Sequence, residues 1–245
     1  MTLQVIHHPV VDRSLKYANT TLGRDKVYKG VQFFARFLAW YLSRINYDKE
    51  TIKRLNSLKS TIASSRKLMR TGKFVEHLQQ ASKALKEKDE IARFTTVGRR
   101  LGYTVYLFCD SLLWAHSTGV YKFEQIKKIT EIAYKFWIFG LTSSIIHCIY
   151  KLHQNGLKKN FFEKNSRSKN IESSEKISSI DSEVIALRRE RKNLTRQLLQ
   201  DIFDIMIPTT FLGYIHLEDG IVGLAGVFSA IIGAKMQWEK VNGAK

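Results

Sequence analysis

The stretch TIKRLNSLKSTIASSRKLMRTGK, residues Thr51–Lys73, combines an apolar stripe with a polar surface that carries only positive charge. At 3.6 residues per turn, one side of the predicted helix holds the apolar residues Ile52, Leu55, Leu58, Ile62 and Met69. The rest of the helix holds the cations Lys53, Arg54, Lys59, Arg66, Lys67, Arg70 and Lys73. Such a helix suits a bilayer interface, where apolar side chains enter the acyl boundary and cations contact anionic headgroups.

The alternative is an ordinary surface helix packed on a protein core. Surface helices of soluble proteins usually mix charges of both signs and gain ion pairs four residues apart. The stretch Thr51–Lys73 has no acidic residue, which favours the membrane interface. We therefore expect its five apolar residues to form a membrane-insertion face and its seven cations to bind anionic phospholipid. We also expect the helix to continue through Phe74–Lys86.

The composition predicts an all-α protein with an anionic partner. The 245 residues include only two prolines, and few stretches alternate strictly between polar and apolar residues. The formal net charge of +18 predicts binding to an anionic membrane or to nucleic acid. The cations are spread along several helices without a zinc-finger or basic-zipper pattern, so we do not expect a nucleic-acid partner.

Two uncharged stretches of fifteen residues, Phe136–Tyr150 and Gly220–Ala234, are candidates for membrane-embedded helices. Each would span about 22 Å as a helix, short of a hydrocarbon core of about 30 Å, so both are predicted to be short or tilted. The apolar run Leu101–Val120 is long enough to cross but contains Asp110, so a half-buried helix fits it as well as a span. The sequence predicts one to three short membrane-embedded helices.

Two segments are expected to pack against other helices. Small residues on one face of Gly220–Ala234 allow close approach of another backbone, in the same chain or in a second copy. These small residues are Gly223, Gly226, Ala230 and Gly233. The aromatic segment Val27–Leu42 is expected to pack within the protein. Its apolar residues at helical spacing are Val27, Val31, Phe34, Phe37, Leu38, Tyr41 and Leu42.

Composition divides the chain into four regions. Residues 1–95 form an amphipathic helical region that contains the remodelling helix 51–73, and residues 96–154 form hydrophobic helices. Residues 155–182 are polar, serine-rich and dense in both charges, and are expected to be a flexible linker. Residues 183–245 hold an amphipathic helix followed by the small-residue hydrophobic helix.

The sequence contains no motif that predicts catalysis. It has no glycine-rich phosphate loop and no nucleophile elbow, and its seven histidines are scattered without motif spacing. The adjacent His7 and His8 lack a carboxylate or cysteine at ligand spacing. We expect neither enzymatic activity nor a cofactor nor a bound metal.

Several short motifs occur in a particular order along the chain. They are His8-Pro9, Gly23-Arg24-Asp25-Lys26, Gln32–Leu38, Thr51–Leu85, Asp110–Trp114, Lys135–Gly140, and Val222–Gly226 with Gly233 and Trp238. In this order the set resembles the peroxin eleven family of peroxisomal membrane proteins, its fungal members above all. The resemblance covers nearly the whole chain and is weakest over residues 155–182.

The resemblance implies a peroxisomal membrane protein that bends and elongates the membrane and promotes peroxisome division and proliferation. In that family the helix matching Thr51–Lys73 inserts into one leaflet. The implied partners are further copies of the chain, a dynamin-related fission GTPase with its membrane adaptor, and a peroxisomal membrane-protein import chaperone.

The resemblance also implies an alternative function, a channel that passes metabolites for fatty-acid oxidation. Helices around Leu101–Val120 and Gly220–Ala234 would then assemble into a pore. Asp110, or Arg99 and Arg100, would face the water in that pore.

Overall fold

The computed structural model describes residues 7–168 and 174–243, and describes side chains for residues 7–162 and 182–243. Within these residues the chain is helical and has no strand, which confirms the all-α prediction. The helices are α2 (Pro9–Ala18), α3 (Thr21–Arg44), α4 (Lys49–Arg70), α5 (Lys73–Ala84), α6 (Glu90–Thr118), α7 (Ile126–Ser168), α8 (Ser174–Phe211) and α9 (Asp219–Asn242).

Polar residues just before the helices set where several of them begin. The Thr20 hydroxyl accepts a hydrogen bond from the backbone N–H of Gly23 at the start of α3. The carboxylates of Asp48 and Asp89 accept bonds from N–H groups in the first turns of α4 and α6. Each cap satisfies a backbone donor that has no partner within its helix.

A turn at Gly72 separates α4 from α5, where we expected one continuous helix. Gly72 has φ of 82°, in the left-handed region that favours glycine. The apolar periodicity runs through this position, but the backbone does not continue as a helix. α5 consequently packs against α6, while α4 packs chiefly against α3.

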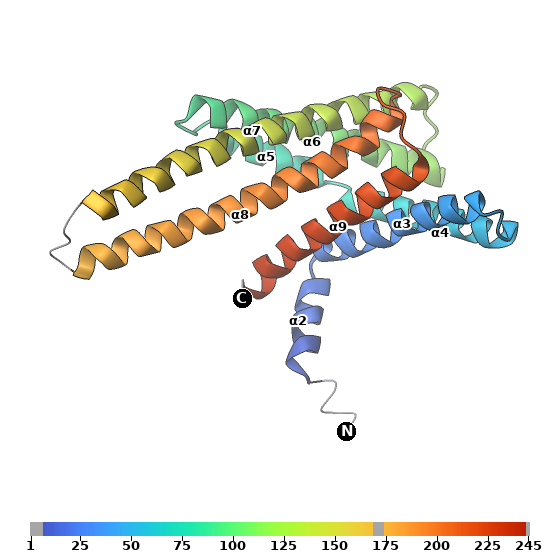
Figure 1. Ribbon diagram of the computed structural model, residues 1–245. Helices are drawn as coiled ribbons and strands as arrows, with labels where there is room; N and C mark the ends of the chain where they lie inside the picture. The colour runs from blue at the N-terminus through green and yellow to red at the C-terminus, as the bar shows by residue number, and fades with distance from the viewer. Residues whose placement is uncertain (1–6, 169–173, 244–245) are drawn as a thin grey trace.

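The helix contacts follow a circular order (Figure 1). α3 packs against α9, α9 against α8, α8 against α7, and α7 against α6. α4 contacts both α3 and α6, so it closes the ring. The N-terminal and C-terminal helices are therefore neighbours, and the interior of the ring receives side chains from both halves of the sequence.

α7 and α8 extend beyond the other helices as an antiparallel pair, at the left in Figure 1. We expected residues 155–182 to be a polar linker, but residues 155–168 continue α7 and residues 174–182 begin α8. The buried Asn155 side chain donates to the backbone oxygen of Leu187 and to the Glu190 carboxylate, which ties the two helices together. Residues 169–173 lie outside the described residues.

Two apolar clusters form the core. One joins Tyr106 and Leu107 of α6 to Ala133 of α7, and the other joins Phe33 of α3 to residues of α8 and α9. Trp137 packs against both clusters, and its ring stacks on Tyr106 with 4.8 Å between centroids. The two clusters are thus continuous across the ring.

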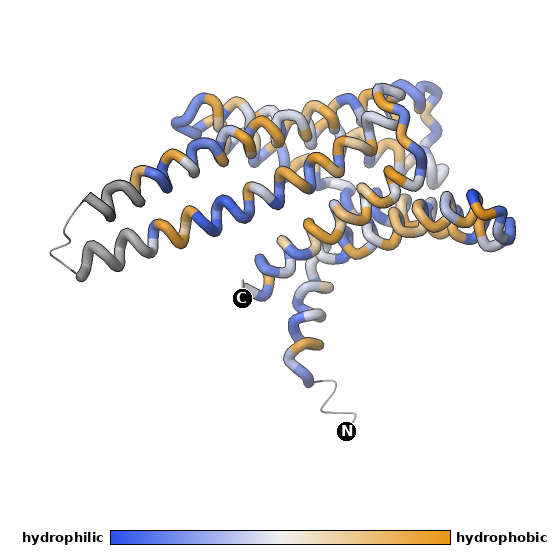
Figure 2. Tube along the Cα trace, in the orientation of Figure 1, coloured by the Kyte–Doolittle hydropathy of each residue, from blue (hydrophilic) through white to orange (hydrophobic). Residues whose placement is uncertain are grey.

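Two helices are long and apolar enough to cross a membrane, the stretch Ile126–Phe162 of α7 and all of α9. This number lies within the predicted range of one to three. α6, which contains most of Leu101–Val120, does not meet the same criterion. Most of α9 is hydrophobic and its C-terminal end is hydrophilic, as Figure 2 shows, whereas the projecting part of α8 is mostly hydrophilic.

Candidate functional site

The distribution of polarity differs from that of a water-soluble protein. Buried positions hold the charged residues Asp25, Lys29, Arg66, Asp110, Asp201 and Asp204. Large apolar side chains are exposed on the outer sides of the helices, including Phe34, Phe94, Phe108, Phe139, Ile146 and Ile231. Lipid solvates apolar side chains, whereas ionisable groups in membrane helices face the bundle interior and pair there. This arrangement therefore fits a bilayer.

This distribution corrects part of our expectation for the aromatic helix. α3 packs against α9 and α4 as expected, but Val27, Val31, Phe34 and Tyr41 are exposed. α3 instead buries Phe33, Ala35 and Ala39 along with Asp25 and Lys29. Apolar periodicity identifies the apolar face of a helix, but it does not distinguish a face that packs on protein from one that contacts lipid.

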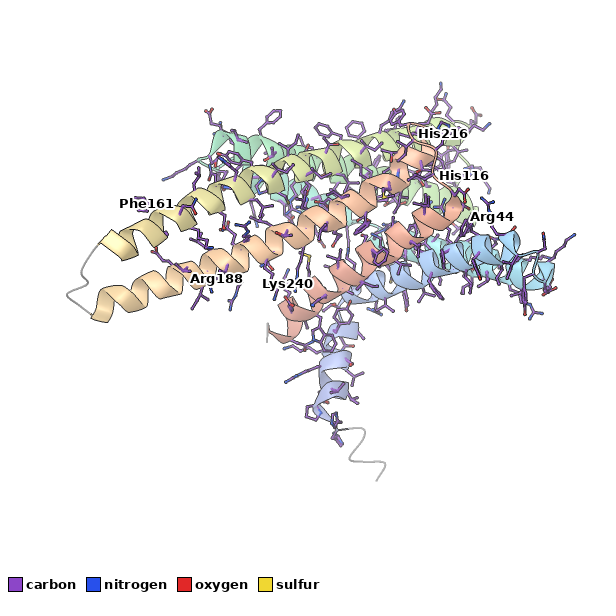
Figure 3. All side chains as sticks on the ribbon, in the orientation of Figure 1. Arg44, His116, Phe161, Arg188, His216 and Lys240 are labelled. Atoms are coloured by element: carbon purple, nitrogen blue, oxygen red, sulfur yellow. The ribbon has the colours of Figure 1, made fainter. Side chains whose placement is uncertain are left out.

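Polar side chains mark the two ends of the helices (Figure 3). Arg44, His116 and His216 lie toward one end, and Lys240 and Arg188 lie toward the other. The Arg44 guanidinium lies over the Trp40 ring, 5.6 Å from its centroid. Arginine and tryptophan at the end of a membrane helix are typical of the headgroup region.

α4 is docked on the protein by three of the cations that we assigned to lipid headgroups. Arg66 is buried, and its Nε lies 3.0 Å from Asp25 Oδ1 on α3. Arg70 pairs with Asp110 of α6 at 2.7 Å, and Lys67 lies 4.0 Å from the same carboxylate. In this structure these three side chains face protein carboxylates, so their predicted role as lipid contacts is corrected.

The other four cations that we assigned to lipid headgroups differ in position, because some lie outside the ring of helices and one lies inside it. Lys53 and Arg54 are exposed on α4, and Lys59 is half-buried and bonded to Asn56. Lys73 is half-buried and lines a cavity inside the ring. Lys53 thus remains available to an anionic surface, whereas the exposed Arg54 also pairs with Glu50 at 3.3 Å.

The apolar residues of the predicted insertion face of α4 also differ in their exposure. Ile52, Leu55, Ile62 and Met69 are half-buried. Leu58 is 44% exposed, and the neighbouring Leu68 is 51% exposed. The apolar residues that α4 presents outward are therefore Leu58 and Leu68 rather than the whole stripe.

The predicted small-residue face lies against α3 of the same chain. Gly223, Gly226, Ala230 and Gly233 are all buried. A Cβ added at Gly223 would lie 2.8 Å from the backbone nitrogen of Phe37. A Cβ added at Gly226 would overlap the ring of Phe33. Close approach of the two helices therefore needs glycine at these positions. α3 occupies this face, so the face is not available to a second copy.

An ion pair joins α3, α8 and α9 beside this seam. Lys29 Nζ donates to Asp204 Oδ1 and, at 2.7 Å, to Ser229 Oγ. Both charged side chains are 7% exposed. Burial lowers the pKa of Lys29 to about 8, and Asp204 opposes the shift. The pair fixes the three helices because each partner would be a buried unpaired charge without the other.

A cavity of about 400 Å³ lies inside the ring and receives side chains from α3, α4, α5, α6, α7 and α8. Its basic residues are Lys26, Lys29, Arg36, Arg66, Lys67, Arg70 and Lys73, and its acidic residues are Asp25, Asp110 and Asp204. Apolar side chains such as Phe33, Leu107 and Trp137 cover other parts of the wall. Its volume and mixed lining are those of a small-molecule or headgroup site.

His77 of α5 forms part of the cavity wall and stacks on Tyr103, with 5.3 Å between ring centroids. Its Nδ1 is buried without a hydrogen-bond partner. Burial, followed by the charges of Arg100, Arg99 and Lys73, lowers the pKa of His77 to about 4. The imidazole is therefore neutral at physiological pH, and its protonation would add a further cation to a basic cavity.

We predict that His77 makes the fold less stable in acid. Because the pKa of His77 in the folded protein lies below the usual histidine value of about 6.5, the unfolded chain takes up the proton first as the pH falls. The contribution of the neutral His77 side chain to the free energy of unfolding is full above about pH 6.5. This contribution is lost as the pH falls from there to about 4. In His77→Gln, the drop in unfolding temperature between neutral and mildly acidic buffer should be smaller than in the wild type. Equal drops in detergent-solubilised protein would contradict this role.

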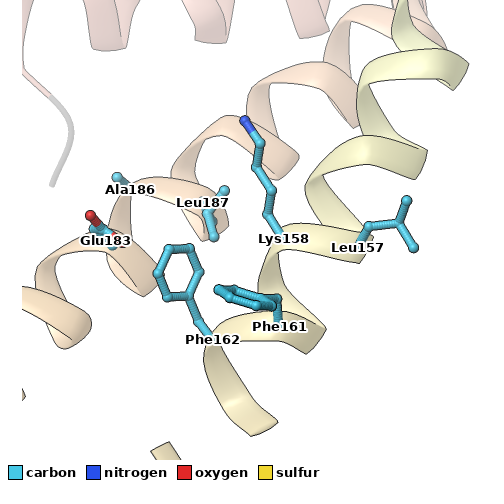
Figure 4. A pocket seen from close by; sticks show the side chains of 7 residues that line it. All are labelled: Leu157, Lys158, Phe161, Phe162, Glu183, Ala186 and Leu187. Atoms are coloured by element: carbon cyan, nitrogen blue, oxygen red, sulfur yellow. The ribbon is translucent and has the colours of Figure 1, made fainter. Parts of the chain in front are cut away.

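A second, apolar pocket of about 600 Å³ lies between α7 and α8 on their projecting part (Figure 4). Leu157, Phe161 and Phe162 line it from α7, and Ala186 and Leu187 line it from α8. The side chains of Lys158 and Glu183 complete the lining. These apolar residues explain why a stretch that we expected to be a linker continues as paired helices.

The sequence did not identify the interior carboxylates as ion-pair partners. Asp25 and Asp110 pair with cations of α4, and Asp204 pairs with Lys29 of α3. A signal was present in each case, because an ionisable residue within a membrane-associated apolar helix is expected to have a partner. The identity of that partner required the packing of the helices.

Comparison with known proteins identifies the chain over almost its full length. Residues 11–238 match the family described as peroxisomal biogenesis factor 11 (PEX11). Peroxisomal membrane proteins PMP30A and PMP30B of Candida boidinii are 32% and 30% identical to it, over 96% of this chain and 96% of each relative. Peroxisomal membrane protein 11A of Homo sapiens is 23% identical over 91% of this chain and 94% of the relative. No solved structure matches. The chain thus belongs to the peroxisomal biogenesis factor 11 family of peroxisomal membrane proteins, with a general role in peroxisome membrane proliferation.

Proposed function

We propose that this protein bends and elongates the peroxisomal membrane by placing α4 in one leaflet. The observation that carries the proposal is the division of α4 into two sides. Arg66 and Arg70 fix its inner side to α3 and α6, while Leu58, Leu68, Lys53 and Arg54 face outward. A helix held in this way is a rigid wedge whose outward side chains enter the bilayer surface.

The physics of bending follows from this geometry. Exposed leucines gain roughly 1.5–3 kcal/mol each on full burial in an apolar medium. Cations near an anionic leaflet add about 1 kcal/mol each. Volume inserted into one leaflet expands that leaflet alone and favours positive curvature. Because α7 and α9 can span the bilayer, each copy stays in the membrane and its wedge acts continuously.

Division of the organelle requires further partners, which we propose from the family resemblance. Self-association would concentrate wedges, and it must use a surface other than the α3–α9 seam. A dynamin-related fission GTPase with its membrane adaptor would cut the elongated tubule. A peroxisomal membrane-protein import chaperone would deliver the chain.

The test uses the full-length protein reconstituted into anionic liposomes and viewed by electron microscopy. Wild-type protein should convert round vesicles into tubules. The variant Leu58→Asp, Leu68→Asp should lose most of them, because two carboxylates oppose insertion and are repelled by anionic headgroups. Both leucines are exposed, so thermal unfolding in detergent should be unchanged.

The matched control is Val10→Asp, Leu15→Asp, which places two carboxylates on exposed apolar residues of α2. It should tubulate vesicles like the wild type. Leu55 and Ile62 are poorer targets than Leu58 and Leu68 because they are half-buried, and aspartate there would also weaken the packing of α4. Unchanged tubulation by the Leu58, Leu68 variant would show that the outer side of α4 is not the wedge.

A second candidate function is a metabolite channel, and the central cavity favours it. Helices surround the cavity, and its lining includes Asp110, one of the residues that the channel hypothesis places against water, although α9 contributes no lining residue. A pore through this region would select anions because of its basic lining. Conductance in planar bilayers should then be anion-selective, and Lys73→Glu should lower the ratio of anion to cation permeability. Absence of conductance by the reconstituted protein would exclude this function.

A further inference from the structure

The cavity inside the ring contains more positive than negative charge. Seven lysine and arginine side chains line it, against three aspartates. All three carboxylates already have cationic partners, Asp25 with Arg66, Asp110 with Arg70, and Asp204 with Lys29. Arg36 pairs with Asp219, and Lys67 lies 4.0 Å from Asp110, so Lys26 and Lys73 are the lining cations without a counter-ion among the described residues. In a space of low dielectric their charge favours entry of an anion.

Two donors in this cavity have no acceptor. Lys26 of α3 is half-buried and makes no hydrogen bond or ion pair with any described residue. Burial lowers its pKa, and Asp204 and Asp25 only partly oppose this effect. The Nε of Arg70 is also buried without a partner. Buried polar groups in proteins are nearly always satisfied, so each unsatisfied donor marks a position that a ligand atom can occupy.

The donors come from different helices, and this decides the shape of the ligand. Lys26 lies on α3, Arg70 on α4 and Lys73 on α5, so an anion between them must present oxygens in several directions. A phosphate group is tetrahedral and carries up to two charges, whereas a carboxylate offers two coplanar oxygens and one charge. Arginine forks and lysine ammonium groups are the usual partners of phosphate.

We propose that the central cavity binds a phosphate group, carried either by a phospholipid headgroup or by a small soluble phosphate. Lys26, Arg70 and Lys73 hold its oxygens, and the apolar wall around Phe33 and Trp137 accommodates the group that carries it. The proposal does not depend on membrane bending. Loss of tubulation by the α4 variant and loss of phosphate binding are separate results.

The experiment measures thermal unfolding of the full-length protein in a neutral detergent, followed by tryptophan fluorescence. Trp137, one of four tryptophans in the chain, lies in the cavity wall and contributes part of this emission. The probes are inorganic phosphate and dihexanoyl phosphatidic acid. Sodium chloride at equal ionic strength and dihexanoyl phosphatidylcholine are the controls. A ligand that binds only the folded state raises the unfolding temperature in proportion to the logarithm of its concentration.

The decisive variant is Lys26→Met, which keeps the side-chain length and removes the charge. Without probe, its unfolding temperature should equal or exceed that of the wild type, because the variant removes a charge that has no partner. Its apparent affinity for the phosphate probe should fall about tenfold or more, the loss expected for a charge-assisted hydrogen bond. Lys53→Met, which removes an exposed cation on α4, should bind like the wild type.

The two probes separate the sources of the phosphate. Stabilisation by both would show that the phosphate group alone suffices, and stabilisation by the lipid alone would assign the cavity to a headgroup. Either result supports the proposal if Lys26→Met weakens the response. No stabilisation by either probe, or an equal response in wild type and Lys26→Met, would overturn it.

Discussion

Replacing Asp204 with alanine is expected to lower the free energy of unfolding by about 3–5 kcal/mol, because it leaves the Lys29 ammonium buried without a counter-ion. Lys29 and Asp204 are each 7% exposed, so water cannot take the place of the missing carboxylate. The pair also links α3 to α8, and through Ser229 to α9. The loss should therefore appear as a lower unfolding temperature of the whole protein, by roughly ten degrees.

The double variant Lys29→Met, Asp204→Leu tests this explanation. It replaces both charged side chains with apolar ones that fill the space, so it should recover most of the stability that Asp204→Ala loses. Thermal unfolding in detergent compares the three proteins directly. If the double variant is as unstable as Asp204→Ala, the loss of stability comes from packing around Asp204 and not from the unpaired charge of Lys29.

Replacing Gly223 with alanine is expected to cost about 1–3 kcal/mol through overpacking. The added Cβ would lie 2.8 Å from the backbone nitrogen and 2.9 Å from the Cα of Phe37. Backbone atoms cannot rotate away as a side chain can, so α9 must move away from α3. A lower unfolding temperature and greater proteolysis near the chain termini would report this separation.

The matched control is Gly156→Ala on α7. No atom lies within 4 Å of a Cβ built there, so the substitution meets open space. Alanine is favoured over glycine in a helix by up to about 1 kcal/mol, and the variant should be equally or slightly more stable. The same substitution therefore has opposite expected effects at two helical glycines. Similar destabilisation at both positions would indicate that the α3–α9 seam is not closely packed.

The helices themselves were predictable from the sequence. Apolar residues at helical spacing located α3, α4 and α9, and the near absence of proline excluded many breaks. The capping residues before α3 and α6 could also be read from the sequence, since Thr20 and Asp89 are good N-cap residues. The small-residue face of α9 indicated a close helix contact. These features are local, so the residues that encode them are near one another in the chain.

The role of the α4 cations was not predictable, because their partners are distant in sequence. Arg66 is 41 residues from Asp25, and Arg70 is 40 residues from Asp110. The stretch Thr51–Lys73 itself contains only positive charge, which is the pattern of a helix that lies on lipid. The packing of α4 on α3 and α6 places three of its seven cations in ion pairs with other helices. The same limit applies to α3, where periodicity located an apolar face that is in fact exposed.

The pairing of α3 with α9 determines when this protein can fold. The ion-pair partners Lys29 and Asp204 are separated by 175 residues, and the glycines that receive α3 come later still. Ribosomes add residues one at a time from the N-terminus, so the first helices emerge long before the residues that neutralise and cover them. An unmatched lysine is costly within a bilayer. The native packing of α3 can therefore form only after α8 and α9 have been synthesised.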